Sequence, residues 1–117
     1  MRDVLHIADL TELIDMQLRE FAKLDGQVFN VGGGLKCSLS LREMTDLCRQ
    51  IVGRTIPTRS VAESRCGDVR VYVSDNAAVT TATGWAPRRH PTDVLADTHS
   101  WVVANEPVLR SLARESG

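Results

Sequence analysis

The sequence predicts an α+β fold, a small and mostly helical lobe with a few short strands. Apolar residues recur at helical spacing through most of the chain. Only two short stretches, 27–31 and 69–73, have the β-branched and aromatic composition of strands. The chain has 117 residues, of which 43% are apolar and 25% are charged. These values are typical of a globular protein, so we expect one domain over residues 1–117.

Residues 8–24 predict the first helix. Apolar side chains recur at helical spacing there, and the dipeptide Asp25-Gly26 ends the pattern. The stretch 27–31 follows as the first strand. The side chains expected on the buried face of the helix are Leu10, Leu13, Ile14, Leu18 and Phe21.

A capping box predicts the second helix. Ser40 and Glu43 have the spacing at which the serine hydroxyl accepts a backbone N–H and the glutamate accepts the N–H of the serine. Gly53 ends this helix, and residues 55–59 follow as an extended segment because Pro57 excludes a helix.

Three shorter helices are expected after the second strand. Ser74 or Asp75 caps the first of them, which ends near Gly84. Thr92 caps the next, and Pro107 fits the first turn of the last.

Composition gives no sign of a nucleic-acid, membrane or metal partner. The net charge is −1 and no basic stripe is visible. No apolar run approaches the length of a membrane span, and the N-terminal stretch lacks the apolar centre of a signal peptide. No histidine stands at the spacing of a zinc finger. The odd number of cysteines argues against a disulfide framework, so we expect a cytoplasmic protein with free thiols at Cys37, Cys48 and Cys66.

The stretch FNVGGG, residues 29–34, raises the question of a phosphate-binding loop. A dinucleotide fingerprint requires GxGxxG, and its third glycine would fall on Cys37. A Walker loop requires GxxxxGK, which is also missing, and the next helix begins several residues further on. We therefore expect these glycines to form a turn that needs positive φ, not a phosphate cradle.

Four short motifs occur in one order along the chain. They are RDVLHIADL, FNVGGG with SLSL after it, RCGDVRVYVSD, and TGWAP followed by a helix that contains a tryptophan. Together they resemble the C-terminal third of the extended short-chain dehydrogenase/reductase family. Within that family they are most similar to NAD-dependent nucleotide-sugar epimerases and dehydratases of the CDP-tyvelose epimerase (CDP-paratose 2-epimerase) type. The resemblance spans nearly all of residues 2–104 and implies a substrate lobe without its Rossmann domain.

The resemblance also implies a set of substrate-binding residues. Arg2 and Arg65 would contact the diphosphate of a nucleoside-diphosphate sugar, because a guanidinium offers two parallel donors. Asp68 would accept a ribose hydroxyl, and Arg70 would line the same pocket. The residues themselves leave simpler alternatives open. Arg2 would form a surface pair with Asp3. Arg65 and Asp68 would form an exposed pair that contributes little energy. Arg70 would face solvent.

By the same resemblance, the catalytic and cofactor-binding parts are missing. The family binds NAD at a GxxGxxG loop and uses a Tyr-x-x-x-Lys pair as its base, whereas the only tyrosine here is Tyr72, with Asn76 four residues later. We expect no catalytic residue, no NAD bound by this chain alone and no isomerase activity. The chain is then a stand-alone remnant that forms a homo-oligomer. Alternatively, it is a binding module that complements a separate dinucleotide-binding chain.

Several remaining residues have both a chemical and a structural interpretation. His6 and Asp9 lie close enough in sequence for an acid–base pair, but also fit a short strand and the first turn of a helix. Cys66 follows an arginine and fits either a reactive thiolate or an inert thiol. Trp85 and Trp101 are expected in the core.

Overall fold

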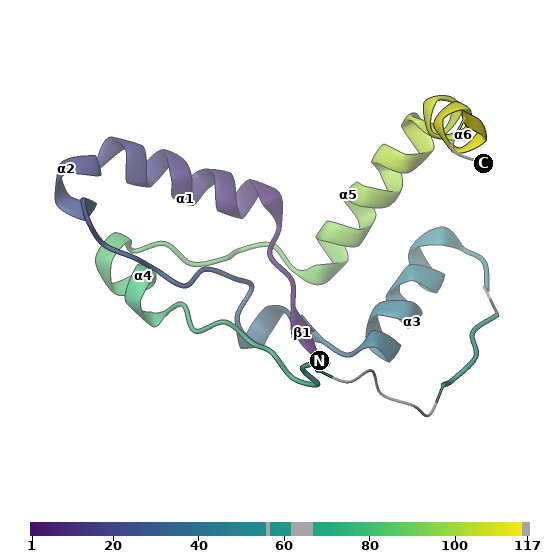
Figure 1. The fold of residues 1–117 in the computed structure, drawn as a ribbon, viewed down its shortest axis with the longest axis horizontal. Helices are drawn as coiled ribbons and strands as arrows, with labels where there is room; N and C mark the ends of the chain where they lie inside the picture. The colour runs from purple at the N-terminus through teal and green to yellow at the C-terminus, as the bar shows by residue number, and fades with distance from the viewer. Residues whose placement is uncertain (56, 62–66, 116–117) are drawn as a thin grey trace.

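The computed structural model describes residues 1–55, 57–61 and 67–115 (Figure 1). Within these ranges the chain is mostly helical, with one two-stranded sheet, which confirms the α+β prediction. The elements in chain order are β1 (Arg2–Asp3), α1 (Ile7–Arg19), α2 (Phe21–Leu24), the 3-10 turn η1 (Leu35–Cys37), β2 (Ser38–Leu39), α3 (Leu41–Val52), α4 (Ala77–Thr83), α5 (Pro91–Ala104) and α6 (Glu106–Glu115).

The first predicted helix forms, but in two pieces. α1 ends at Arg19, and α2 begins after Glu20. His6 was expected on a short strand but instead caps α1, where its Nδ1 accepts the backbone N–H of Ala8 at 3.1 Å. This bond satisfies one of the free N–H groups of the first helical turn.

The apolar face of α1 and α2 is only partly covered. Leu13 is buried as expected, but Ile14, Leu18 and Phe21 are 47%, 69% and 65% exposed. Helical spacing shows which face of a helix is apolar, and burial also requires another element against that face. No element within the described ranges covers this part of α1 and α2.

Neither predicted strand forms a regular strand. β1 instead pairs antiparallel with β2, with Arg2 opposite Leu39. From the stretch 69–73, only Tyr72 takes part in pairing, through a parallel bridge to Arg2. The stretch 27–31 has no ladder at all, because a strand needs a neighbour to complete its hydrogen bonds and no described segment provides one.

The caps of α3 agree with the predictions. The N–H of Ser40 donates to Glu43 Oε2 at 2.7 Å, and the N–H of Glu43 donates to Ser40 Oγ at 3.2 Å. The bond from the Ser40 N–H to the Glu43 carboxylate, followed by the contribution of the Ser40 side chain, holds the pKa of Glu43 below its ordinary value. Gly53 ends α3 with φ of 71°. The N-cap of α4, however, is Asn76 and not Ser74 or Asp75. Asp75 lies one residue earlier, where its Oδ1 accepts the N–H of Ala77 at 2.9 Å. Gly84 ends α4, as predicted.

The start of α5 differs from the prediction. The residue before its first turn is His90, not Thr92, and Pro91 is the first helical residue. A proline fits there because its missing N–H would have no partner in the first turn. Asp93 Oδ2 accepts the His90 N–H at 2.7 Å. Pro107 lies in the first turn of α6, as predicted.

The core is small and lies between α1 and α4. Leu13, Val79 and Trp85 are buried together, and Trp85 Nε1 donates to the carbonyl of Asp9 at 2.9 Å. The prediction for Trp85 is therefore confirmed, whereas the prediction for Trp101 is wrong because its side chain is exposed on α5. The partly buried side chains against this core are Leu5, Met16, Phe29 and Val31.

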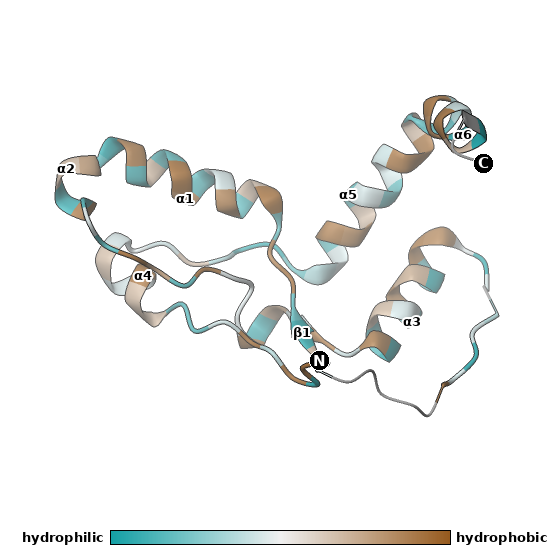
Figure 2. Cartoon of the chain, viewed as in Figure 1, coloured by the Kyte–Doolittle hydropathy of each residue, from teal (hydrophilic) through white to brown (hydrophobic). Residues whose placement is uncertain are grey.

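The molecule is extended and exposes much of its surface. Its accessible area is 9235 Å², whereas a folded monomer of 12.9 kDa is expected to expose about 6,300 Å². The Cα radius of gyration is 17.8 Å, against about 13.4 Å for a compact domain of this length. Figure 1 shows α5 leaving the body of the molecule and carrying α6 at its far end, and Figure 2 shows apolar bands on α1, α2 and α6.

Among the described helices, none combines the length and apolar character that crossing a bilayer requires.

Candidate functional site

The glycine loop is held by two side chains from other segments. Gly32 and Asn76 exchange two hydrogen bonds, Gly32 N–H to Asn76 Oδ1 at 3.0 Å and Asn76 Nδ2 to the Gly32 carbonyl at 2.8 Å. Asp3 Oδ2 accepts the N–H of Gly34 at 2.9 Å and that of Ser74 at 3.1 Å. Burial alone would raise the pKa of Asp3, but the bonds from Gly34 and Ser74 hold this pKa below its ordinary value.

The three glycines are required for two different reasons. Gly34 has φ of 68°, the conformation expected of a turn glycine. At Gly32 and Gly33 the reason is close packing. A Cβ at Gly32 would lie 2.1 Å from Ser74 Oγ, and one at Gly33 would lie 2.1 Å from the Val4 carbonyl oxygen. The prediction that these glycines supply positive φ is therefore confirmed for Gly34. For Gly32 and Gly33 the reason is close packing, which the prediction did not include.

This loop does not fit a dinucleotide. The N–H groups of Gly32 and Gly34 already donate to Asn76 and Asp3, so they are not directed at a ligand. The Asp3 carboxylate at the loop would also repel a diphosphate. NAD, the cofactor implied by the resemblance, therefore has no matching phosphate cradle at the glycines of this chain.

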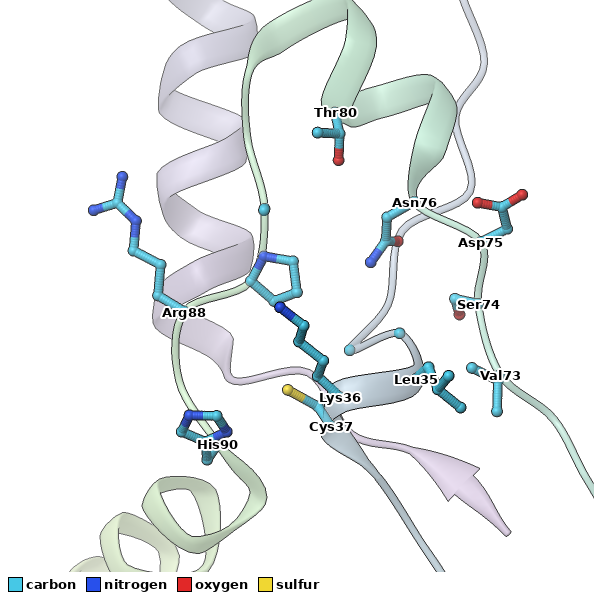
Figure 3. A pocket seen from close by; sticks show the side chains of 14 residues that line it. Leu35, Lys36, Cys37, Val73, Ser74, Asp75, Asn76, Thr80, Arg88 and His90 are labelled. Atoms are coloured by element: carbon cyan, nitrogen blue, oxygen red, sulfur yellow. The ribbon is translucent and has the colours of Figure 1, made fainter.

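A cleft of about 610 Å³ lies beside the loop (Figure 3). Three separate segments, 33–37, 73–80 and 86–90, contribute its walls. Figure 3 shows Asn76 and Thr80 on one side of it, with Lys36 and Cys37 on the other. Sequence reasoning missed this cleft, because no single motif contains its walls.

The thiol in this cleft is poorly suited to nucleophilic chemistry. Cys37 is buried and its Sγ donates to the Arg89 carbonyl at 3.4 Å. Burial, followed by the negative charges of Asp9, Asp3 and Asp93, raises the pKa of the Cys37 thiol. The thiol therefore stays protonated near neutral pH. Cys48 is also a free thiol, and Cys66 lies outside the described residues.

Three of the four predicted substrate-binding residues line a second, smaller cleft. Arg2, Asp68 and Arg70 surround about 260 Å³ together with residues 39–41. Arg65 lies outside the described residues. The two segments are joined by their backbones, since the Tyr72 N–H donates to the Met1 carbonyl at 3.0 Å.

Arg2 pairs with Asp68 and not with Asp3. Its Nη2 lies 3.0 Å from Asp68 Oδ1, and the two side chains are 52% and 58% exposed. Asp3 instead turns towards the glycine loop, where its carboxylate accepts the two backbone bonds described above. The contact between Arg2 and Asp68 joins residues that are 66 positions apart in the sequence.

His6 and Asp9 do not form an acid–base pair with each other. His6 Nε2 lies 3.0 Å from Asp97 Oδ2. The Asp9 side chain is 1% exposed, accepts the N–H groups of Arg88 and Arg89 at 3.1 and 3.0 Å, and pairs with the Arg89 guanidinium. Burial alone would raise the pKa of Asp9, but these bonds from Arg89 and Arg88 lower it. Both residues thus have structural roles, and the partners of Asp9 were missed in the sequence.

No group of three or more potential metal ligands gathers anywhere in the part of the chain that the structure describes.

Comparison with known proteins finds relatives of one kind. The chain is 33% identical over 103 residues to a CDP-paratose 2-epimerase of Salmonella typhi, covering 86% of this chain and 30% of the relative. It is 30% identical over 103 residues to a UDP-glucose 4-epimerase of Halalkalibacterium halodurans, with 86% and 29% covered. It is 30% identical over 105 residues to a dTDP-glucose 4,6-dehydratase of an Actinoplanes species, with 90% and 32% covered.

The chain thus spans about 30% of the length of the curated relatives that it matches. No family model matches it.

Proposed function

Because the chain belongs to the extended short-chain dehydrogenase/reductase family of nucleotide-sugar epimerases and dehydratases, matching their C-terminal part, we propose that it is a nucleotide-sugar-binding lobe. Its ligand is the nucleoside diphosphate portion of a CDP- or UDP-sugar. The observation that carries this proposal is the meeting of Arg2, Asp68 and Arg70 in one cleft, although they come from two distant segments.

The charges in this cleft suit a diphosphate beside a ribose. A guanidinium binds phosphate oxygens through two parallel bonds, which are stronger than an exposed contact with a carboxylate. The Arg2–Asp68 pair is half-exposed, so opening it costs about 1 kcal/mol or less. A phosphate would then replace Asp68 on Arg2. The freed carboxylate would accept a ribose hydroxyl, and Arg70 would add a second positive charge.

The Arg2→Ala variant is expected to bind CDP and UDP at least about tenfold more weakly than the unaltered chain, since it loses a charge-assisted contact. Isothermal titration calorimetry measures this change, and Arg65→Ala is expected to act in the same direction. Arg110→Ala is the matched control. It removes the same charge from an exposed pair with Glu106 on α6, at 2.6 Å, far from the cleft. Equal affinities for Arg2→Ala and Arg110→Ala would contradict the proposed site.

The chain alone is expected to show no epimerase or dehydratase turnover. The family's base is a tyrosine in Tyr-x-x-x-Lys, and Tyr72 is not followed by that lysine. The glycine loop also fails to fit NAD. Incubation with NAD and a CDP- or UDP-sugar, followed by chromatography of the sugar products, is expected to give no conversion above background. Conversion that rises with protein concentration would overturn this expectation.

A second candidate function, in assembly, is supported by the exposed surface. The chain exposes about 2,900 Å² more than a compact monomer of its mass, as the difference between 9235 Å² and about 6,300 Å². Such a surface favours burial against another protein, either a second copy or a separate dinucleotide-binding chain. The free thiols Cys37 and Cys48 fit the cytoplasmic location proposed for it.

A further inference from the structure

A strand-forming stretch lies open at the surface of the molecule. No backbone N–H or C=O of residues 28–31 has a hydrogen-bond partner in the part of the chain that the structure describes. Burial alternates along it, with Val28 94% exposed and Asn30 exposed, while Phe29 and Val31 pack against the core. Alternating burial and free backbone groups are the properties of an edge strand without its neighbour.

An apolar groove of about 310 Å³ adjoins this stretch. Ile14, Leu18 and Phe21 line its helical side, and Phe29 lines the side of the open stretch. These helical residues are the apolar face of α1 and α2 that no described element covers. The groove and residues 27–31 thus form one continuous surface, named here the open-strand surface.

The charges around the open-strand surface are compatible with a second copy. Asp15 pairs with Arg19 at 2.9 Å, and Glu20 pairs with Lys23 at 2.8 Å, so these charges are balanced within each molecule. Asp25 is the one charged residue among those described in the groove lining. The stretch QVFNV carries no charge. Two such surfaces can therefore approach without strong like-charge repulsion.

The molecule as a whole exposes enough extra area to supply an interface of the size that a dimer needs. A stable interface of standard size buries about 800 Å² on each partner. The excess of about 2,900 Å² over a compact monomer belongs to the whole molecule, and an interface of standard size needs less than a third of it.

We propose that a second copy of this chain covers the open-strand surface. Residues 27–31 of the two copies pair as antiparallel edge strands about a two-fold axis, since such an axis brings identical strands together in opposite directions. The pairing satisfies the free backbone groups of 28–31, and the apolar faces of α1 and α2 pack across the interface. This inference rests on the self-association included in the proposed function and names the surface responsible for it.

Val28→Lys tests the interface directly. Val28 is 94% exposed in one molecule, so the change is expected to leave the fold and its circular dichroism spectrum unaltered. When residues 27–31 of the two copies pair in antiparallel order, position 28 of one copy lies opposite position 30 of the other. The two lysines are then diagonal neighbours on the same face of the paired strands, where their like charges oppose pairing. Sedimentation equilibrium is expected to show a dimer for the unaltered chain. For Val28→Lys the dissociation constant of the dimer is expected to be at least about tenfold higher. Val108→Lys is the matched control, because Val108 is also exposed, at 58%, but lies on α6.

Amide hydrogen exchange provides the second measurement. Residues 28–31 are expected to exchange slowly in the dimer and quickly in Val28→Lys, because strand pairing protects their N–H groups. A dimer that resists Val28→Lys but dissociates with Val108→Lys would overturn the inference and place the interface on α6. A monomeric unaltered chain, or one that associates only with a dinucleotide-binding chain, would overturn it as well. Nucleotide binding at Arg2 would remain testable by calorimetry in either case.

Discussion

Asp9→Ala is expected to destabilise the chain by about 3 to 5 kcal/mol, the range seen when one partner of a buried ion pair is removed. The carboxylate is buried and accepts two backbone N–H groups, those of Arg88 and Arg89, in addition to the Arg89 guanidinium. Its removal leaves both N–H groups without an acceptor. It also weakens the connection between α1 and the segment that carries Trp85, whose indole donates to the Asp9 carbonyl.

Urea denaturation of Asp9→Ala and Asp15→Ala measures this effect. Asp15 lies on the same helix and pairs with Arg19 in an exposed contact, so its removal is expected to cost about 1 kcal/mol or less. If Asp9→Ala is unfolded without denaturant, Asp9→Asn, which keeps one acceptor oxygen, provides the intermediate value. Equal unfolding midpoints for the Asp9 and Asp15 variants would contradict the role assigned to Asp9.

The contribution of Asp9 should also depend on pH in a definite direction. Its pKa in the folded chain is lowered, so the carboxylate binds protons more readily in the unfolded chain. The stabilisation is therefore complete above the unfolded pKa of about 3.9, and it is lost as the pH falls through the folded value. The difference in free energy of unfolding between the unaltered chain and Asp9→Ala should shrink below about pH 4.

Gly33→Ala is expected to destabilise the chain by about 3 kcal/mol or more, at the upper end for overpacking. The added Cβ would lie 2.1 Å from the Val4 carbonyl oxygen and 2.7 Å from the Val4 carbonyl carbon. These are backbone atoms, and the Val4 N–H is held by a 3.0 Å bond to the Cys37 carbonyl. The contact can therefore be relieved only by moving backbone, either that of the glycine loop or that of the chain between β1 and α1.

Gly53→Ala separates this packing effect from the ordinary cost of replacing a turn glycine. Gly53 has φ of 71° and nothing within 4 Å of its added Cβ. Its replacement is expected to cost about 1 to 2 kcal/mol through backbone conformation alone. Thermal unfolding of the two variants compares them, and a smaller loss for Gly33→Ala than for Gly53→Ala would refute the close-packing explanation.

The parts of the fold that the sequence predicts well are determined by local interactions. The capping box of Ser40 and Glu43 and the glycine at the end of α3 lie within one helix and its two ends. The partners of Asp9 are 79 and 80 positions away, so no local pattern indicates them. The same limit explains the error at 27–31, because strand composition does not show whether a neighbouring strand exists.

The candidate site was predictable only through family resemblance. Arg2 and Asp68 carry no local pattern that would join them, and their 3.0 Å contact depends on the pairing of two distant segments. The 610 Å³ cleft was not predicted because it is built from three segments, none of which has a ligand motif. The glycine loop has the most ligand-like sequence in the chain, yet Asp3 and Asn76 use the N–H groups of Gly34 and Gly32.

A nuclear magnetic resonance titration of the isotopically labelled chain with CDP and UDP tests the proposed nucleotide site most directly. It locates the bound nucleotide independently of any variant. If the nucleotide binds at the proposed site, the largest shifts of backbone amide signals occur at Arg2, Asp68 and Arg70. Largest shifts at Gly33, Gly34 and Lys36 in the other cleft, or no shifts at saturating nucleotide, would contradict the claim that this chain is a nucleotide-sugar-binding lobe with its site at Arg2.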